Sequence, residues 1–287
     1  MQKPVKHCTI SFVQSYRVHR RLGKKAHQDG QPIKAGRQAV RVIAFHNLKG
    51  GVGKTAAAVN IAYLAAESGV PTLLWDLDAQ GAASWYLGEA PDIVGEKAAR
   101  LVKGKTPVGQ MIQPTAYDRL DLIPAHPSFR NLDLRLEKDG DKHALRDWLK
   151  PLSEDYGLIV LDCPPSLSRL AEQILETADQ VFVPIIPSWL SLNSWEQLVE
   201  FANEKKMGHK KMHPFLSMVD RRKKVHQEIL ATKKGPLKGR MHAFIPYASD
   251  VEKMGENRCP VDRIRARGPA AIAYRLLWNE VRKVTRI

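Results

Sequence analysis

Apolar and polar positions along this 287-residue chain follow the alternation of strands and helices that is typical of α/β proteins. The apolar runs at 40–45, 158–161 and 181–187 have the length of strands, and the second is continuous, as in a strand buried on both faces of a parallel sheet. Residues 56–66 are strong helix formers with apolar side chains at helical spacing. We therefore predict one α/β domain over residues 40–287, with a mostly parallel central sheet and helices on both faces.

A glycine-rich loop follows the first predicted strand and precedes the first predicted helix. It reads Lys-Gly-Gly-Val-Gly-Lys-Thr over residues 49–55. Loops that end in Gly-Lys-Thr at a helix N-terminus wrap backbone N–H groups around nucleotide phosphates, and the helix dipole adds to the attraction. The alternative is an ordinary glycine turn, which does not explain why strand, loop and helix occur in this order. We therefore expect a three-layer P-loop NTPase that binds a nucleoside triphosphate.

Most positions of the loop have an expected role in binding ATP and Mg²⁺. Lys54 would bridge the β- and γ-phosphates, and the Thr55 hydroxyl would coordinate Mg²⁺. The phosphate contacts would come from Gly50, Gly51, Val52, Gly53, Lys54, Thr55 and Ala56. The general motif needs glycine where this chain has Leu48, and Lys49 is one lysine more than phosphate binding needs.

Acidic residues end two further apolar runs. Asp76 and Asp78 close the run that begins at Leu73 and, being two apart, project on the same side of an extended chain. Asp162 closes the run at 158–161 and is followed by two prolines that would stop the strand. Ligands bind at the carboxyl ends of parallel strands. We expect one acid of the pair to support Mg²⁺, the other to orient the attacking water, and Asp162 to hold Mg²⁺ through water. A solvated turn is the alternative for the pair.

The motifs KGGVGKT, DLDAQG and LIVLDCPPSL resemble those of the ParA/MinD group of deviant Walker ATPases, and the resemblance to the ParA family is closest, over residues 41–287. It implies a homodimer that forms on ATP, binds DNA without sequence preference and hydrolyses ATP slowly until DNA and a ParB-like or other cargo-adaptor partner stimulate it. It also implies a cytoplasmic, nucleoid-associated protein that segregates or positions a plasmid, a chromosome or a protein assembly.

The resemblance also implies roles for single residues. Lys49 would be the signature lysine that reaches the nucleotide of the partner subunit. Asp78 would set up the hydrolytic water and take part in the magnesium site, and Asp162 would stand behind the magnesium shell. Met218 and Pro246 would lie in the adenine pocket at strand ends.

Other positions match or depart from the family pattern. Asn60 matches the asparagine on the helix after the loop. Residues 244–246 resemble the closing strand of the family, and the stretch around 273–281 resembles its last helix. Ala56 stands where a second threonine is usual, and Ala79 where proline is common. These two departures bear on nucleotide affinity and rate, because neither removes a residue assigned to chemistry.

The balance of charge points to a polyanionic partner. The chain has 45 Lys and Arg against 30 Asp and Glu, a formal net charge of +15. Basic residues concentrate within 203–240, where clusters can release counterions from DNA. Asp220 and the two arginines after it resemble the Asp-x-Arg segment of the family, whose arginine contributes to DNA binding. The residues we expect to bind DNA are Arg221, Arg222, Lys223 and Lys224. For any single lysine the alternative is a solvated loop or helix face.

The first 39 residues are polar and basic with little periodicity, and we expect a disordered extension. Whether they add DNA contacts, form a transit peptide or reflect a misassigned translation start stays open. Trp189 directly precedes a predicted helix at 190–202 and Trp195 lies within it, and both are expected in the core or on a dimer face.

Three other classes of protein are alternatives to a DNA-binding partition ATPase. A MinD-like membrane ATPase needs a membrane-seeking helix beyond the core, and 276–287 is accounted for by the last core helix, so no membrane partner is expected. A nucleotide-gated regulatory adaptor with little turnover stays open. A metal-cluster relative is disfavoured because Cys8, Cys163 and Cys259 are isolated.

Overall fold

The structure, a computed structural model, describes residues 40–88, 95–102, 105–232 and 235–287. The prediction of a disordered basic extension over residues 1–39 lies outside the described residues.

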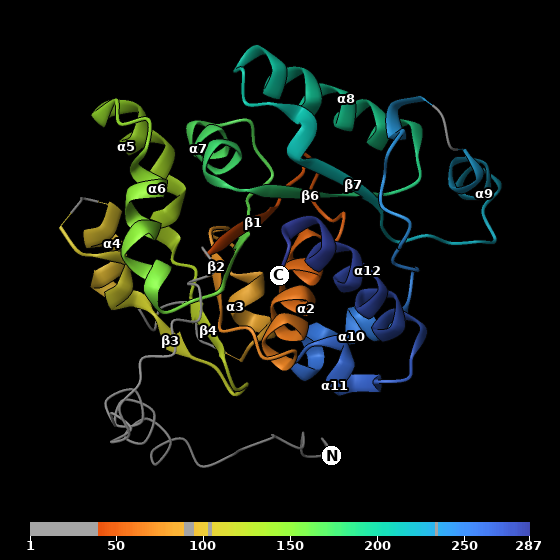
Figure 1. The fold of residues 1–287 in the computed structure, drawn as a ribbon, viewed down its shortest axis with the longest axis horizontal. Helices are drawn as coiled ribbons and strands as arrows, with labels where there is room; N and C mark the ends of the chain where they lie inside the picture. The colour runs from red at the N-terminus through yellow and green to blue at the C-terminus, as the bar shows by residue number, and fades with distance from the viewer. Residues whose placement is uncertain (1–39, 89–94, 103–104, 233–234) are drawn as a thin grey trace, which may run out of the picture. The chain divides into compact units, whose positions relative to one another are not determined.

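One sheet runs through the described part of the chain, with strand order β3-β4-β2-β5-β1-β6-β7 (Figure 1). Its strands are β1 Arg41–Phe45, β2 Thr72–Asp76, β3 Gln113–Pro114, β4 Leu120–Ile123, β5 Leu158–Asp162, β6 Gln180–Ile185 and β7 Met212–Leu216. Every neighbouring pair is parallel except β3 with β4. The predicted runs at 40–45, 158–161 and 181–187 therefore correspond to β1, β5 and β6, and the mostly parallel sheet is confirmed.

Helices cover both faces of the sheet (Figure 1). One face packs against α4 Gly95–Val102, α5 Leu132–Asp139, α6 Ala144–Leu149, α7 Arg169–Thr177 and α8 Trp189–Glu204. The other packs against α2 Lys54–Glu67, α3 Ala82–Tyr86, α10 Ser249–Asn257, α11 Val261–Arg265 and α12 Pro269–Thr285. Helix α9 spans Lys224–Ala231, and the short 3-10 helices are η1 Val108–Met111, η2 Pro127–Asn131, η3 Lys150–Glu154, η4 His209–Lys211 and η5 Gly235–Leu237. The three-layer α/β class is confirmed.

The two halves of the core follow from the alternation of side chains along the strands. In β1, Val42 and Ala44 belong to the cluster on the α7 and α8 side, whereas Ile43 and Phe45 belong to the cluster around α2. The alanine-rich α2 is buried on nearly all sides because it lies against the sheet and against α12. A helix that is apolar all round is expected in such a central position.

Strand register brings the predicted site residues to one edge. Strand β1 lies between β5 and β6, and Phe45, its last residue, pairs with Asp162 of β5 and Phe182 of β6. Strand β2 lies on the far side of β5, where Asp76 pairs with Asp162. The loop after β1 and both acids therefore lie at the carboxyl edge of the sheet.

The expected closing strand at 244–246 is wrong, because this segment forms no strand. Met241 N–H donates to Pro214 O at 2.9 Å and Ile245 N–H to Leu216 O at 2.9 Å, so four residues span a stretch that two residues of β7 cover. His242 and Ala243 lie between these two bonds, and the Glu280 carboxylate accepts their N–H groups. What remains is a single parallel bridge between Val219 and Pro246.

The predicted helix at 190–202 and the expected last helix are confirmed as α8 and α12. Trp195 is 7% exposed and belongs to the core, whereas Trp189 is 70% exposed and lies outside it, so a place on a dimer face stays a prediction for Trp189. None of the helices in the described ranges has the length and apolar character to span a membrane.

Candidate nucleotide-binding site

The loop between β1 and α2 has the backbone of a phosphate cradle. Gly51 and Gly53 have positive φ values of 70° and 92°, which favour glycine. A Cβ atom at Gly53 would lie 2.8 Å from the Ser217 hydroxyl oxygen, so any side chain there would force Ser217 to shift. No side chain caps the N-terminus of α2, which leaves its first N–H groups available to an anion. The loop therefore has glycines where its backbone needs them and a free helix N-terminus beside them.

Lys54 is largely buried at the base of this loop. Its Nζ donates a hydrogen bond to the Lys49 carbonyl oxygen at 2.9 Å. Burial lowers the pKa of Lys54, and the nearby Asp162 carboxylate opposes that shift. A partly desolvated ammonium held by a carbonyl gains strongly from contact with phosphate oxygens, because electrostatic attraction increases in a low-dielectric site.

Two acids lie side by side in the sheet at the same edge. Asp76 and Asp162 are both fully buried. Asp76 Oδ2 accepts bonds from the Ser84 N–H and hydroxyl, each at 2.8 Å. Burial raises the pKa of Asp76 to about 7, although the Ser84 bonds lower it. Burial and then the charge of Asp76 raise the pKa of Asp162 well above its usual range, opposed by the Thr55 hydroxyl and Lys54.

The Asp162 carboxylate fits a role near a cation. Both its oxygens are buried and lack a partner with normal hydrogen-bond geometry among the described residues. A divalent cation close by would offset the repulsion between the two acids. The described residues contain no group of three or more His, Cys, Asp or Glu side chains that could hold a metal. Mg²⁺ in nucleotide sites needs no such cage, because phosphates and water supply most ligands. Thr55 and Asp162 therefore fit Mg²⁺.

Asp78 lies two residues past the end of β2 and is half-buried. Its Oδ1 accepts the Gln80 N–H at 3.0 Å, which stabilises the turn after the strand. Asp76, by contrast, is occupied by Ser84. The two acids of the motif therefore have different environments, and Asp78 is the more accessible one.

Lys49 is tied to the carboxyl end of β6 and to α8. Its N–H donates to Asn47 Oδ1 at 3.0 Å, and Asn47 Nδ2 donates to Pro184 O at 2.7 Å. Its ammonium lies 3.5 Å from the hydroxyl oxygen of Ser191, in the first turn of α8. In the described chain Lys49 therefore points to α8, whereas Lys54 points into the cradle.

The residues expected in the adenine pocket lie beside the same edge. Met218 has a positive φ of 54°, which is unusual for a residue with a side chain. It lies between Ser217, which faces Gly53, and Val219, which bridges to Pro246. Met218 and Pro246 are both half-buried. The structure thus brings them together near the loop.

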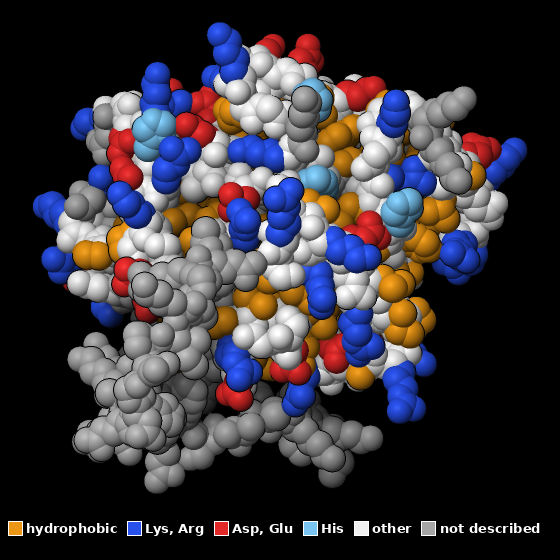
Figure 2. All heavy atoms as spheres, viewed as in Figure 1, with side chains coloured by type: hydrophobic (Ala, Val, Ile, Leu, Met, Phe, Trp, Pro, Cys, Tyr) orange, Lys and Arg blue, Asp and Glu red, His pale blue; other side chains and the backbone are white. Residues whose placement is uncertain are grey.

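The residues expected to bind DNA, Arg221, Arg222, Lys223 and Lys224, are all exposed. The Arg222 guanidinium donates to both Asp220 oxygens at 2.9 Å, and Arg221 stacks over Phe244 at 5.3 Å. Lys and Arg side chains are spread over the face seen in Figure 2, with acidic side chains between them. The basic excess is therefore distributed across that face and not gathered into one block.

Four polar residues around the loop were missed by the sequence reasoning. Asn47 ties the loop to β6, Ser191 approaches Lys49, Ser84 holds Asp76, and Ser217 abuts Gly53. Asn47 could have been found from its place two residues before the extra lysine. Ser84, Ser191 and Ser217 carry no motif, and their contacts arise only when distant strands meet.

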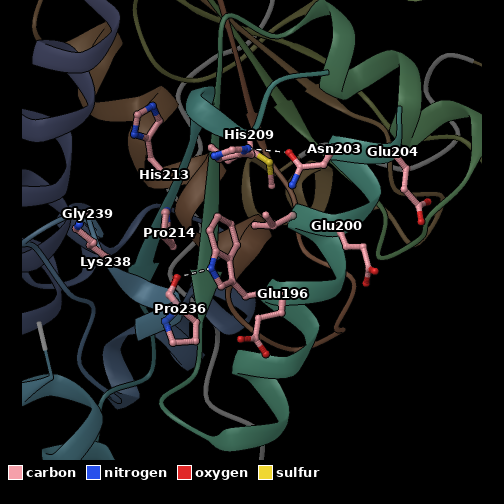
Figure 3. Close-up of a pocket in the computed structure, with 13 residues that line it drawn as sticks. Glu196, Glu200, Asn203, Glu204, His209, His213, Pro214, Pro236, Lys238 and Gly239 are labelled. Atoms are coloured by element: carbon pink, nitrogen blue, oxygen red, sulfur yellow. Dashed lines mark hydrogen bonds between the residues drawn. The ribbon is translucent and has the colours of Figure 1, made fainter. Parts of the chain in front are cut away.

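A groove of 740 Å³ lies elsewhere, between α8, β7 and the segment around Pro236 (Figure 3). Trp195 Nε1 donates to Pro236 O at 2.8 Å across it, and His209 pairs with Asn203 at 2.7 Å. None of the predicted site residues lines this groove. It is separate from the nucleotide site.

Three comparisons bear on the family. The AAA_31 model, an AAA domain, matches residues 40–214. The chromosome partitioning protein ParA of Myxococcus xanthus is 32% identical over 213 residues, covering 71% of this chain and 74% of the relative. The chromosome-partitioning ATPase Soj of Treponema pallidum is 28% identical over 247 residues, 84% of this chain and 96% of Soj. The structure of a Cyanothece McdA complex with ATP has a TM-score of 0.75 at 19% identity and covers 86% of this chain and 97% of its own, which shows a shared fold.

A glycine-rich loop at the carboxyl edge of a parallel sheet in a three-layer fold defines a P-loop NTPase. Within that class, the extent of the family match and the identity to the Myxococcus protein settle the family. The chain belongs to the ParA family of partition ATPases.

Proposed function

We propose that this ParA-family chain forms a homodimer on ATP, binds DNA without sequence preference, and uses hydrolysis to segregate or position a plasmid, a chromosome or a protein assembly. The observation that carries the proposal is the position of Lys49. Lys54 already completes the phosphate cradle, and the Lys49 ammonium is directed to a neutral serine hydroxyl. A second lysine beside a nucleotide site has a use on the γ-phosphate of a partner subunit, where it couples ATP binding to dimerisation.

Different residues of one subunit would bind the phosphates, bind Mg²⁺ and orient the attacking water. Bound ATP with Mg²⁺ would supply the electrophilic phosphoryl group. The loop N–H groups and Lys54 would hold the phosphates, and Thr55 and Asp162 would hold Mg²⁺, the acid through water. Asp78 orients the attacking water, since it is the more accessible acid after β2. In phosphoryl transfer such positioning and charge stabilisation account for nearly all of the catalysis.

The relatives support this role. Those from Myxococcus xanthus and Treponema pallidum are named for chromosome partitioning, and the Cyanothece neighbour was solved with ATP. Met218 and Pro246 would contact the adenine, and Arg221 to Lys224 would contact DNA phosphates. A ParB-like or other cargo adaptor, together with DNA, would stimulate turnover. The net charge of +15 favours a polyanionic partner, which would be nucleoid DNA in the cytoplasm.

The experiment is a comparison of Lys49→Ala with Lys54→Ala. We expect Lys49→Ala to bind a fluorescent ATP analogue and yet lose hydrolysis by about 10³-fold or more, as when a cationic group supplied by a partner is removed. It should also lose the ATP-dependent dimer on a sizing column. Lys54→Ala should lose nucleotide binding itself, because its ammonium lies at the base of the cradle.

Two outcomes would count against the proposal. Wild-type turnover in Lys49→Ala would show that the loop acts within one subunit. A wild-type chain whose ATPase activity does not rise with the cognate partner and DNA together would instead favour a nucleotide-gated adaptor with little turnover.

A further inference from the structure

The first turn of α8 carries two apolar side chains that nothing in the described chain covers. Trp189 is 70% exposed and Leu190 is 64% exposed, and Trp189 has the highest exposed fraction of the large apolar side chains in the described ranges. The two residues directly follow Ser188, whose side chain caps the helix by accepting the Ser191 N–H at 3.3 Å. Adjacent exposed apolar residues of this size usually mark an interaction surface.

Their exposure is a property of the helix pattern. The stripe of α8 that packs on the sheet begins at Ser191 and continues through Leu192, Trp195, Leu198 and Ala202. This spacing already gives the helix a complete buried face. Trp189 precedes the stripe, so packing of α8 on the sheet does not explain why the residue is a tryptophan.

The position of Trp189 and Leu190 near Lys49 indicates which molecule would contact them. Leu190 directly precedes Ser191, whose hydroxyl oxygen lies 3.5 Å from the Lys49 ammonium. The pair is therefore next to the lysine that we assign to the partner's nucleotide. In an isologous interface both copies present the same surface, so residues beside Lys49 face the partner as well.

We propose that Trp189 and Leu190 form an apolar contact with a second copy of this chain in the ATP-bound dimer. The inference rests on the proposed function, because it takes the dimer face to be the face that carries Lys49. The first turn of α8 contains no acidic residue, so an apolar contact there meets no like-charge repulsion between carboxylates. Two side chains are far too small a contact for a stable dimer, which needs about 800 Å² from each partner. The contact therefore strengthens a dimer that still depends on ATP.

The test uses Asp78→Ala as the parent, because slowed hydrolysis holds the ATP state. Trp189→Ala and Trp189→Ala/Leu190→Ala are made in this parent, and the monomer–dimer dissociation constant is measured by sedimentation with saturating ATP. We expect at least a tenfold weakening, the size seen for truncation of an interface tryptophan. ATP affinity of the monomer should stay unchanged, since neither residue contacts the loop in any interaction of the described chain.

The matched control is Ile272→Ala/Leu276→Ala on α12, where two large apolar residues are likewise exposed, at 48% and 54%. It should leave the dimer unchanged. If the parent dimerises on ATP and the Trp189 variants have the same dissociation constant as the parent, the inference is overturned and the proposed function stands. A parent that stays monomeric with ATP overturns the proposed function and the inference together. ATP-dependent binding to anionic vesicles that Trp189→Ala abolishes would also overturn the inference, because the pair would then contact lipid.

Discussion

Replacing Gly53 by alanine tests the phosphate cradle most directly. Gly53 has a φ of +92°, and a Cβ atom there would lie 2.8 Å from the hydroxyl oxygen of Ser217. The backbone conformation costs roughly 1–2 kcal/mol for a residue with a side chain. The close contact adds about 1–3 kcal/mol of overpacking, because Ser217 is buried and its N–H is bonded to Ile185 O at 2.9 Å. The expected loss in the free energy of unfolding is therefore about 2–5 kcal/mol.

Two further variants separate the two terms. Gly69→Ala has nearly the same backbone conformation, with a φ of +95° and no heavy atom within 4 Å of the added Cβ, so it should lose only the backbone term. Gly53→Ala/Ser217→Ala should recover the overpacking term and keep the backbone loss. Urea unfolding followed by tryptophan fluorescence gives each free energy. A Gly53→Ala chain as stable as wild type, or one that Ser217→Ala does not rescue, would refute this account of the loop.

Two other predictions concern charges. Burial raises the pKa of Glu172, but bonds from Lys205 and Arg169 outweigh it, so the net pKa is lowered. Because the pKa of Glu172 is lower in the folded chain, its carboxylate stabilises the folded state at pH values above its unfolded pKa of about 4.5. This stabilisation is lost as the pH falls through the folded pKa. Glu172→Gln should thus cost about 1 kcal/mol in urea unfolding at pH 7 and nothing near pH 3; an equal cost at both would contradict it. The Asp220 carboxylate accepts hydrogen bonds from the Arg222 guanidinium and so competes with DNA phosphates for it. In a salt titration, Asp220→Asn should therefore tighten DNA retention and Arg222→Glu should weaken it. Unchanged retention in both variants would show that Arg222 is not part of the DNA interface.

Much of the fold was accessible from the sequence because the sheet is parallel and buried on both faces. Strands such as β5, Leu158–Asp162, have no polar side chain before their carboxyl end, so the apolar run and its limit are both visible. The position of the site follows from the same fact. An acid that ends a buried strand must lie at the edge where the loop after β1 also lies.

Features that depend on long-range geometry were not accessible. The segment at 244–246 has an apolar composition suited to a strand, but the Glu280 carboxylate, far along the chain, takes the N–H groups of His242 and Ala243 beside it. In the sequence Ser84 looks like an ordinary helix residue, and only the structure shows that its hydroxyl donates a hydrogen bond to Asp76. No local pattern reports such pairings, because each partner is set by the packing of elements that are distant in sequence.

Lys49 shows how the two proposals depend on each other. In the described chain its ammonium approaches the first turn of α8, the same turn that presents Trp189. A lysine that acts on a partner's phosphate must leave this position when the dimer forms. The partner would then cover Trp189 as Lys49 exchanges a neutral hydroxyl for an anion. Because a ligand shifts an equilibrium only through its differential affinity for the two states, ATP would favour the dimer through the phosphate that Lys49 gains. The apolar contact at Trp189 would add to the stability of the dimer without making it independent of ATP.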